Sequence, residues 1–336
     1  MYSKKSSQPK LYVVIGPTAS GKSDYAVMLA KKHDGEIISA DSRQVYKDLN
    51  IGTGKVVGKW QKISFVLSRS SLAKDQGQKT KDSSCFVYQK VIHHCIDFVS
   101  SRRQYSVANF KKDAHKALRD ILARNKTPIL CGGTGQFIDS ILLSQPIPEV
   151  APDPVFRKKM GKKTSAQLFA LLQKKDAVRA ANIDRHNPRR LIRALEIIHA
   201  TGRSVPYRPV IPEFSALRKY PESGIAQGSG FRVKPGMTIP IKIHYLNPPR
   251  KKLYKKIEQR LKERLKQGMV AEVKKLHQQG LPWRRCEDLG LEYRYVSRYV
   301  RGLIAYDEMY TQLLSEIKHY AKRQQTWFRK YVKNNR

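Results

Sequence analysis

Residues 16–23 have the sequence GPTASGKS, and this stretch constrains the fold more than any other part of the chain. It matches the pattern G-x-x-x-x-G-K-[ST] of phosphate-binding loops. The apolar run LYVVI at 11–15 precedes it, and the following KSDYAVMLAKKH has a helical pattern. In such a strand–loop–helix unit, backbone N–H groups and the helix N-terminus bind phosphate oxygens. The sequence therefore predicts an α/β domain with a site for a nucleotide or another diphosphate.

Each position of this loop has an expected role. Two glycines let backbone N–H groups turn toward phosphate oxygens, and Lys22 reaches a phosphate. The hydroxyl of Ser23 can ligate Mg²⁺, which is the cofactor that we expect. The predicted binding loop consists of Gly16, Pro17, Thr18, Ala19, Ser20, Gly21, Lys22 and Ser23.

Strand and helix patterns alternate along the first part of the chain. EIISAD at 36–41 and PILC at 128–131 have strand patterns, and residues 106–124 carry apolar side chains at helical spacing. Another helix is expected to begin near Gln136. This alternation predicts a P-loop NTPase-like, doubly wound parallel sheet with its site at the carboxyl ends of the strands.

The second half of the chain is expected to return to this sheet. Residues 203–238 are rich in Pro, Gly and Ser and predict a long loop, and IPIKIHYL at 239–246 predicts a further strand. Apolar residues at helical steps then predict two long helices, at 250–279 and 307–331.

Two segments interrupt the alternating pattern. In residues 56–92, WQKISFVL and CFVYQKV flank the polar stretch SRSSLAKDQGQKTKDSS, which predicts a β-hairpin with a long tip. Residues 153–200 are helical and basic, with Asp153 as an expected cap. We therefore expect a discontinuous α/β core at 8–144 and 213–336, a hairpin insertion at 56–92, and a helical, basic insertion domain at 145–212.

Composition indicates the class of partner. Lys plus Arg number 66 and Asp plus Glu number 27, which gives a formal charge of +39. Self-repulsion on this scale favours a polyanionic partner, and nucleic acid is a better match than a membrane surface. No apolar run reaches the ~18 residues of a membrane-spanning helix. The four cysteines form no C-x-x-C pair, so we expect free thiols in a reducing, cytoplasmic compartment.

The carboxylates near the loop differ from those of common nucleotide hydrolases. The strand at 128–131 ends in Cys-Gly-Gly, where such hydrolases often have an Asp that holds Mg²⁺. The carboxylate available is Asp41, at the end of the second strand. It can act as a general base, hold magnesium, or cap the segment SRQVY that follows.

Six blocks of sequence occur in order between residues 10 and 331: GPTASGKS, ISADSRQVYKDLNIGTGK, CGGTGQF, NPRRLIRALEII, KIEQRLKERLKQGMVAEVKKL and YAKRQQTWFRK. In these blocks the chain resembles the tRNA dimethylallyltransferases. The resemblance implies transfer of a dimethylallyl group from its diphosphate to N6 of the adenosine immediately 3′ of the anticodon. The loop would then hold an isoprenoid diphosphate, and the partners would be tRNA and dimethylallyl diphosphate.

The resemblance also implies roles for individual residues. Asp41 would be the base, Arg260 would contact the diphosphate, and Thr18 and Lys22 would border it. Trp327 either stacks on a base or is buried. The residues that the resemblance places against tRNA are Asp41, Ser42, Arg43, Gln44, Thr134, Arg157, Arg189, Arg190, Leu191, Ile192, Arg193, Lys322, Arg323, Gln324, Gln325, Thr326, Trp327, Phe328 and Arg329.

The chain departs from the family pattern in two places. The 56–92 hairpin replaces a short loop, and the block LGLEYRYV leaves open whether Tyr293 or Arg294 contacts tRNA. Three other functions are also open: a P-loop phosphotransferase or NTPase acting on RNA, an isopentenyltransferase acting on free adenine nucleotides, and a non-enzymatic RNA-binding module. We expect a monomer that does not bind membranes.

Overall fold

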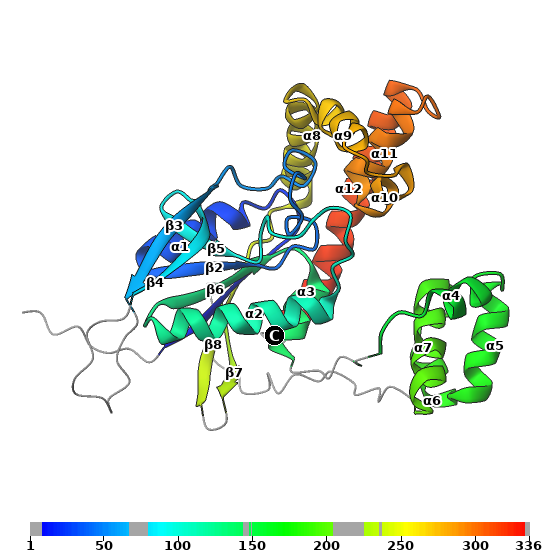
Figure 1. Cartoon of the computed structure of the whole chain (residues 1–336), viewed down its shortest axis with the longest axis horizontal. Helices are drawn as coiled ribbons and strands as arrows, with labels where there is room; N and C mark the ends of the chain where they lie inside the picture. The colour runs from blue at the N-terminus through cyan, green and yellow to red at the C-terminus, as the bar shows by residue number, and fades with distance from the viewer. Residues whose placement is uncertain are drawn as a thin grey trace, which may run out of the picture. The chain divides into compact units, whose positions relative to one another are not determined.

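A computed structural model describes residues 9–66, 80–143, 148, 150–203, 225–234 and 237–332. These residues fall into two compact units, one within 1–142 and 213–336 and the other within 143–212. Figure 1 shows the elements of each unit. Among the described residues, no helix combines the length and apolar character needed to cross a membrane.

An eight-stranded sheet forms the centre of the larger unit, in the order β3-β4-β5-β2-β6-β1-β8-β7. Its five middle strands pair in parallel, which confirms the predicted doubly wound sheet. All five residues of the strand before the loop are buried, because helices cover both faces. The parallel strands are β1 (Leu11–Ile15), β2 (Gly35–Ser39), β5 (Val91–His94), β6 (Thr127–Gly132) and β8 (Met237–Tyr245).

Three helices cover this sheet: α1 (Lys22–Lys32), α2 (Val107–Ala123) and α3 (Gly135–Leu142). Helix α1 follows the phosphate-binding loop directly, after Gly21 at a left-handed φ of 85°. Helix α2 begins at a capping box, in which the Ser106 hydroxyl accepts from the Asn109 backbone N–H. These short connections fix the loop at the carboxyl edge of β1.

Antiparallel strands extend the sheet at both edges. The pairing of β3 (Lys59–Val66) with β4 (Thr80–Tyr88) confirms the predicted hairpin, whose tip at 67–79 lies outside the described residues. On the other edge, β7 (Ile225–Lys234) pairs with β8. The long loop predicted for 203–238 is therefore wrong over the residues of β7. Gly and Ser lower the strand propensity of residues 225–234, but the backbone hydrogen bonds to β8 outweigh this low propensity. Residues 204–224 lie outside the described part.

A group of helices completes the larger unit. The single helix expected at 250–279 is wrong, because Gly268 with φ of 98° separates two helices. The apolar faces of these helices pack into one buried cluster. The group consists of α8 (Arg250–Lys266), α9 (Met269–Gln278), α10 (Trp283–Asp288), α11 (Leu291–Val300) and α12 (Tyr306–Phe328), with a short 3₁₀ turn at Arg329–Tyr331.

The smaller unit is helical, as its sequence predicts. Each of its helices has a side-chain cap at its N-terminus, which ends the preceding loop and satisfies free N–H groups. Leu168, Leu172, Leu191 and Leu195 form part of its own core. Its helices are α4 (Pro154–Met160), α5 (Ser165–Lys175), α6 (Ala177–Ala181) and α7 (Pro188–Thr201).

Candidate active site

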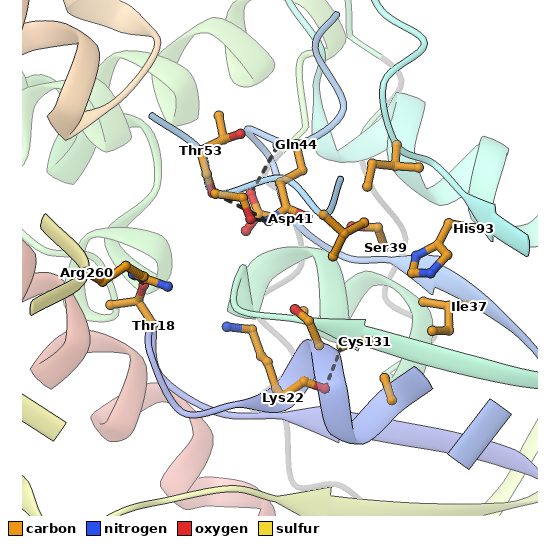
Figure 2. Close-up of a pocket in the computed structure, with 16 residues that line it drawn as sticks. Thr18, Lys22, Ile37, Ser39, Asp41, Gln44, Thr53, His93, Cys131 and Arg260 are labelled. Atoms are coloured by element: carbon orange, nitrogen blue, oxygen red, sulfur yellow. Dashed lines mark hydrogen bonds between the residues drawn. The ribbon is translucent and has the colours of Figure 1, made fainter. Parts of the chain in front are cut away.

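A cavity lies between the phosphate-binding loop and the carboxyl ends of β2 and β6. Figure 2 shows Lys22 on one side of it and Asp41 with Gln44 on the other. Helix α8 contributes Arg260, although it follows the loop by more than two hundred residues in the sequence. The cavity therefore brings together the predicted loop, the predicted base and the predicted arginine.

Two cations face this cavity without an ion pair to a described carboxylate. The Lys22 ammonium donates to the Pro17 carbonyl at 3.3 Å, and the Arg260 guanidinium donates to the Thr18 hydroxyl. Burial lowers the pKa of both Lys22 and Arg260, and the Arg260 charge lowers that of Lys22 further. Because buried charges without partners are unfavourable, this end of the cavity is suited to an anion.

Helix α12 fastens the loop to the turn after β6. Gln324 is 5 % exposed; its Oε1 accepts from the Thr18 N–H at 2.8 Å, and its Nε2 donates to the Gly133 carbonyl at 2.8 Å. A Cβ at position 133 would lie 2.4 Å from Gln324 Nε2, so any other residue there would displace the end of that side chain. Gln324 thus fixes the two backbone segments that border the anion site.

The two oxygens of the Asp41 carboxylate have different surroundings. Its Oδ1 accepts from the Arg43 N–H at 2.8 Å and the Gln44 N–H at 3.3 Å, so it does cap the following turn. No described residue donates to its Oδ2, and Asp41 lines the cavity. The cap orients the side chain and leaves one oxygen free to accept a proton.

The polar residues after Asp41 also face this region. Ser42 donates its N–H to the Thr134 hydroxyl at 3.0 Å, which joins the end of β2 to the turn after β6. The Gln44 amide donates to the Gly54 carbonyl at 3.2 Å. Ser42, Gln44 and Thr134 therefore lie near Asp41.

Tyr320 of α12 is a functional candidate that the sequence did not reveal. Burial raises the pKa of its hydroxyl, and nearby Asp41 raises it further, while the hydroxyl bonds Thr134. Burial also lowers the pKa of Arg43, whose guanidinium forms no ion pair with a described carboxylate. Both side chains are half-buried near Asp41, and the Arg43 guanidinium is suited to an anion.

Glu272 is another residue whose role the sequence did not reveal. It holds the turn at 50–54, which forms one wall of the cavity. Glu272 of α9 accepts N–H groups from Asn50, Ile51 and Gly52 at 3.0, 2.8 and 3.1 Å. The Tyr293 hydroxyl donates to the same carboxylate at 2.8 Å. No local pattern indicates this role, because the two segments are separated by more than two hundred residues.

The hydrogen bond between Tyr293 and Glu272 also bears on whether Tyr293 or Arg294 can contact tRNA. Tyr293 is 1 % exposed, and its hydroxyl bonds Glu272, so its side chain has no surface for RNA. Arg294 is half-buried and donates its Nε–H to the Glu287 carbonyl at 3.1 Å. Of the two, only Arg294 keeps an accessible side chain.

The C-terminal residues predicted to contact tRNA divide by helix face. Phe328 is fully buried and Gln324 is nearly so, which corrects the expectation for their side chains. Gln325 donates to Asn247 at 2.8 Å, and Trp327 is 38 % exposed and donates to Asp139 at 3.1 Å. The exposed members of this set are Lys322, Arg323, Thr326, Trp327 and Arg329.

In the small unit, too, some of the residues predicted to contact tRNA are exposed and others are buried. Arg189 and Arg190 are exposed and Ile192 is half-buried, whereas Leu191 is fully buried in the core. The side chain of Leu191 therefore cannot contact tRNA, because it packs among the helices of this unit.

Two arginines of the small unit have a structural partner. Arg157 and Arg193 bind the buried carboxylate of Glu196 at 2.7 and 2.6 Å. Burial alone would raise the pKa of Glu196, but these two hydrogen bonds lower it to about 2. Both guanidinium groups therefore have a structural partner in Glu196, while their side chains remain 40 % and 33 % exposed, so their contact with tRNA stays a prediction.

A magnesium ligand can come from Ser23. Ser23 lines the cavity, and no described residue forms a hydrogen bond with its hydroxyl. Among the described residues, no group of three His, Cys, Asp or Glu side chains could hold a metal ion. One hydroxyl beside an anion site fits Mg²⁺, which often takes its other ligands from phosphates and water.

Comparison with known proteins agrees with this geometry. The IPP transferase family model matches residues 79–331, and an isopentenyl transferase model matches residues 9–64. The tRNA dimethylallyltransferase 2 of Treponema denticola is 36 % identical, over 96 % of this chain and 92 % of its own length. The tRNA dimethylallyltransferase of Carboxydothermus hydrogenoformans is 34 % identical, over 96 % and 89 %.

Solved structures agree as well. The tRNA isopentenylpyrophosphate transferase of Bacillus halodurans has a TM-score of 0.57 and 29 % identity, covering 96 % of this chain and 87 % of that one. A eukaryotic dimethylallyltransferase acting on tRNA shares the fold, with a TM-score of 0.66 at 20 % identity, over 95 % of this chain and 70 % of that one. Because its family model and its curated relatives match over most of its length, the chain belongs to the IPP transferase family.

Proposed function

We propose that the protein is a tRNA dimethylallyltransferase. It transfers the dimethylallyl group of dimethylallyl diphosphate to N6 of the adenosine immediately 3′ of the anticodon and releases diphosphate. The observation that carries this proposal is the cavity itself, in which Lys22 and Arg260 form no ion pair with a described carboxylate and no described residue donates to Oδ2 of Asp41. The names of the relatives support the same reaction.

The cations assist departure of the diphosphate. The allylic C–O bond breaks, and its electron pair leaves with the diphosphate. The loop N–H groups, Lys22 and Arg260 stabilise that developing charge, in the way that preorganised donors stabilise transition states. Ser23 would hold Mg²⁺, which supplies further neutralisation of the leaving group.

Asp41 acts on the nucleophile. A bond forms between the adenine N6 and the allylic carbon, and N6 loses a proton to the free Oδ2 of Asp41. An exocyclic amine of adenine is a weak nucleophile, so a positioned base contributes substantially to the rate. The Gln44 amide donates to the Gly54 carbonyl, and Gln44 thereby helps to shape the cavity wall against which the adenine lies.

The charge distribution supports tRNA as the acceptor. The target adenine must leave its stack to reach Asp41. Exposed Arg189 and Arg190 of the small unit, with Lys322 and Arg323 of α12, supply cations for phosphates along the RNA. We assign the small unit as the tRNA-binding insertion. Four free, buried cysteines agree with a reducing, cytoplasmic compartment, in which we expect the protein to act as a monomer.

Two observations weigh against the alternative functions. The end of β6 presents Cys131 and Gly132 to the cavity, where a nucleotide hydrolase would place a magnesium carboxylate. An enzyme for free adenine nucleotides has no need of the +39 charge. Incubation with ATP, with and without tRNA, should release no phosphate coupled to product.

The variant Asp41→Asn tests the proposal. It keeps the cap geometry and removes the proton acceptor, so the transfer rate should fall by roughly 10²–10⁴-fold. Transfer is measured in single turnovers with saturating tRNA, and tRNA affinity is measured by filter binding. The control Asp307→Asn changes an exposed Asp in the first turn of α12 and should leave both unchanged.

Three results would overturn the proposal. A near-wild-type rate in Asp41→Asn would place the base elsewhere. Steady ATP turnover coupled to product would make the protein a nucleotide hydrolase or phosphotransferase. Prenylation of free adenosine monophosphate as fast as tRNA would make tRNA a secondary acceptor.

A further inference from the structure

The segment that follows β2 forms the wall of the cavity on which Asp41 lies. Gln44, Thr53, Gly54 and Val56 of this segment line the cavity together with Asp41. Figure 2 shows Thr53 and Gln44 beside Asp41. The segment consists of turns and loop around a single isolated bridge. Contacts from neighbouring elements must therefore hold it in place.

Asp97, which lies just after β5, holds this segment at two points. Its N–H donates to the Gln44 carbonyl at 2.9 Å, and its Oδ1 accepts from the Lys55 ammonium at 2.6 Å. The same ammonium donates to the Tyr46 carbonyl at 2.7 Å and to the Asn50 side chain at 2.9 Å. Asp97 and Lys55 thus join the beginning of the segment to its end.

Both members of this pair depend on their surroundings. The Lys55 side chain is 3 % exposed, and burial lowers the pKa of its ammonium while the hydrogen bond to Asp97 raises it. Cys95 and Asp97 have left-handed φ angles of 57° and 55°, and Ile96 between them lines the cavity. Residues other than glycine keep such a conformation only where neighbouring groups fix it. The orientation of Asp97 therefore needs a further contact.

The hairpin insertion supplies that contact. Trp60 of β3 donates its indole N–H to Oδ2 of Asp97 at 2.9 Å. Across the hairpin Trp60 pairs with Phe86, and the two rings meet edge to face with their centroids 5.9 Å apart. Phe86 is buried and fixes the direction of the indole, whereas Trp60 remains 44 % exposed. Packing in the core thus accounts for only part of the Trp60 side chain.

We propose that Trp60 is a positioning residue for the transfer reaction, through which the hairpin insertion fixes the cavity wall that carries Asp41. The indole N–H orients Asp97, which in turn holds Lys55 and Gln44. The bond changes of the transfer step are unaffected, because Trp60 acts only on the position of the wall. This inference rests on the proposed function, since it concerns the same site.

Two substitutions separate the hydrogen bond of Trp60 from its packing. Trp60→Phe keeps an aromatic ring against Phe86 and removes the N–H donor. Trp60→Gln removes the ring and keeps a donor, because the Nε2 of glutamine is as many bonds from Cβ as the indole nitrogen. The transfer rate should follow the donor, whereas the stability should follow the ring.

The size of the effect follows from one hydrogen bond. At a partly exposed site, such a bond shifts the balance between two positions of a segment by about 3- to 10-fold. Single-turnover transfer at saturating tRNA and dimethylallyl diphosphate should therefore be about 3- to 10-fold slower in Trp60→Phe than in the wild type. Trp60→Gln should transfer faster than Trp60→Phe but unfold at a lower urea concentration. The KM for the donor and the tRNA affinity of Trp60→Phe should stay at their wild-type values.

Two further variants assign the effect to this contact. The matched control is Ser64→Ala in the same strand, because the Ser64 hydroxyl donates to Asp82 across the hairpin at 2.5 Å. Ser64→Ala should transfer at the wild-type rate. Asp97→Asn completes a double-mutant cycle, in which Trp60→Phe should slow the Asp97→Asn protein less than it slows the wild type.

The outcomes separate this inference from the proposed function. A wild-type rate in Trp60→Phe, an equal slowing by Ser64→Ala, or additive effects in the cycle with Asp97→Asn would overturn the inference alone. A folded Trp60→Gln protein that transfers no faster than Trp60→Phe would do the same. Circular dichroism verifies folding, and the cycle decides if Trp60→Gln is unfolded. Absence of transfer by folded wild-type protein would overturn the proposed function and the inference with it.

Discussion

The variant Gln324→Met tests whether α12 positions the diphosphate site. Gln324 joins the Thr18 N–H to the Gly133 carbonyl through two hydrogen bonds of 2.8 Å. Methionine has a similar length and flexibility but can form neither bond. The substitution therefore leaves a donor and an acceptor without partners beside the anion site, at a position that is 5 % exposed.

The expected magnitude follows from these two groups. Each polar group left unsatisfied on burial costs about 1–3 kcal/mol, so the loss of two partners should lower the free energy of unfolding by about 2–6 kcal/mol. The effect on the rate has a different origin. The Thr18 hydroxyl accepts from Arg260, so a displaced loop also displaces the guanidinium that we propose contacts the diphosphate. Such displacements cost up to roughly 10²-fold, and we expect a 10- to 100-fold lower transfer rate.

Urea unfolding measures the stability, and single turnovers at saturating tRNA measure the rate. The neighbouring Gln325→Met is the matched control, because Gln325 bonds only the Asn247 side chain and is half-buried. The control should change stability by less than about 1 kcal/mol. Wild-type stability and rate in Gln324→Met would refute the reasoning. A loss of tRNA affinity with unchanged kinetics toward the donor would instead make Gln324 an RNA contact.

Three further predictions concern other parts of the chain. Arg260→Ala should slow transfer by roughly 10²–10³-fold and spare tRNA affinity in filter binding, because the leaving diphosphate is the partner that we propose for Arg260; an equal loss of affinity would make Arg260 RNA-facing. Glu196→Gln should destabilise the protein more at pH 7 than near pH 3. The folded pKa of about 2 lies below the unfolded value, so the stabilisation is present above the unfolded pKa and is lost as the pH falls toward 2; a pH-independent difference in urea unfolding would contradict this. Deletion of residues 70–79, which keeps strand β4 intact, should leave the single-turnover rate unchanged, because the tip is polar and replaces a short loop. If the tip neutralises phosphates, each one lost should flatten the log–log salt dependence of tRNA binding by about 0.7, and a large loss of rate would place the hairpin in the active site.

The sequence predicted the parts of the fold that depend on local signals. The strand, loop and helix around Lys22 are contiguous, and each has a clear pattern of its own. Asp41 and Cys131 could be placed at one edge because the carboxyl ends of parallel strands meet there. The helix break at Gly268 was missed, since an isolated glycine within an apolar helical pattern does not by itself decide between a break and a weakened helix.

The contacts that complete the site could not be predicted in this way. Gln324 lies 306 positions after Thr18, and Glu272 lies 221 positions after Ile51. Neither has a local motif, and only the packing of α9 and α12 brings these side chains to the loops that they hold. Leu191 was different, because its apolar spacing already placed it on the buried face of α7, and that pattern outweighs its position in an RNA-binding block.

The two faces of α12 connect the two substrates of the proposed reaction. Its buried face carries Gln324, which fixes the loop and the turn around the diphosphate site. Its exposed face carries Lys322 and Arg323, which are available to phosphates of the RNA. Because one rigid helix bears both sets, RNA bound to the exposed face lies at a fixed position relative to the donor. Substitutions on α12 should then separate by face: exposed cations should change affinity and its salt dependence, and the buried glutamine should change the rate of transfer.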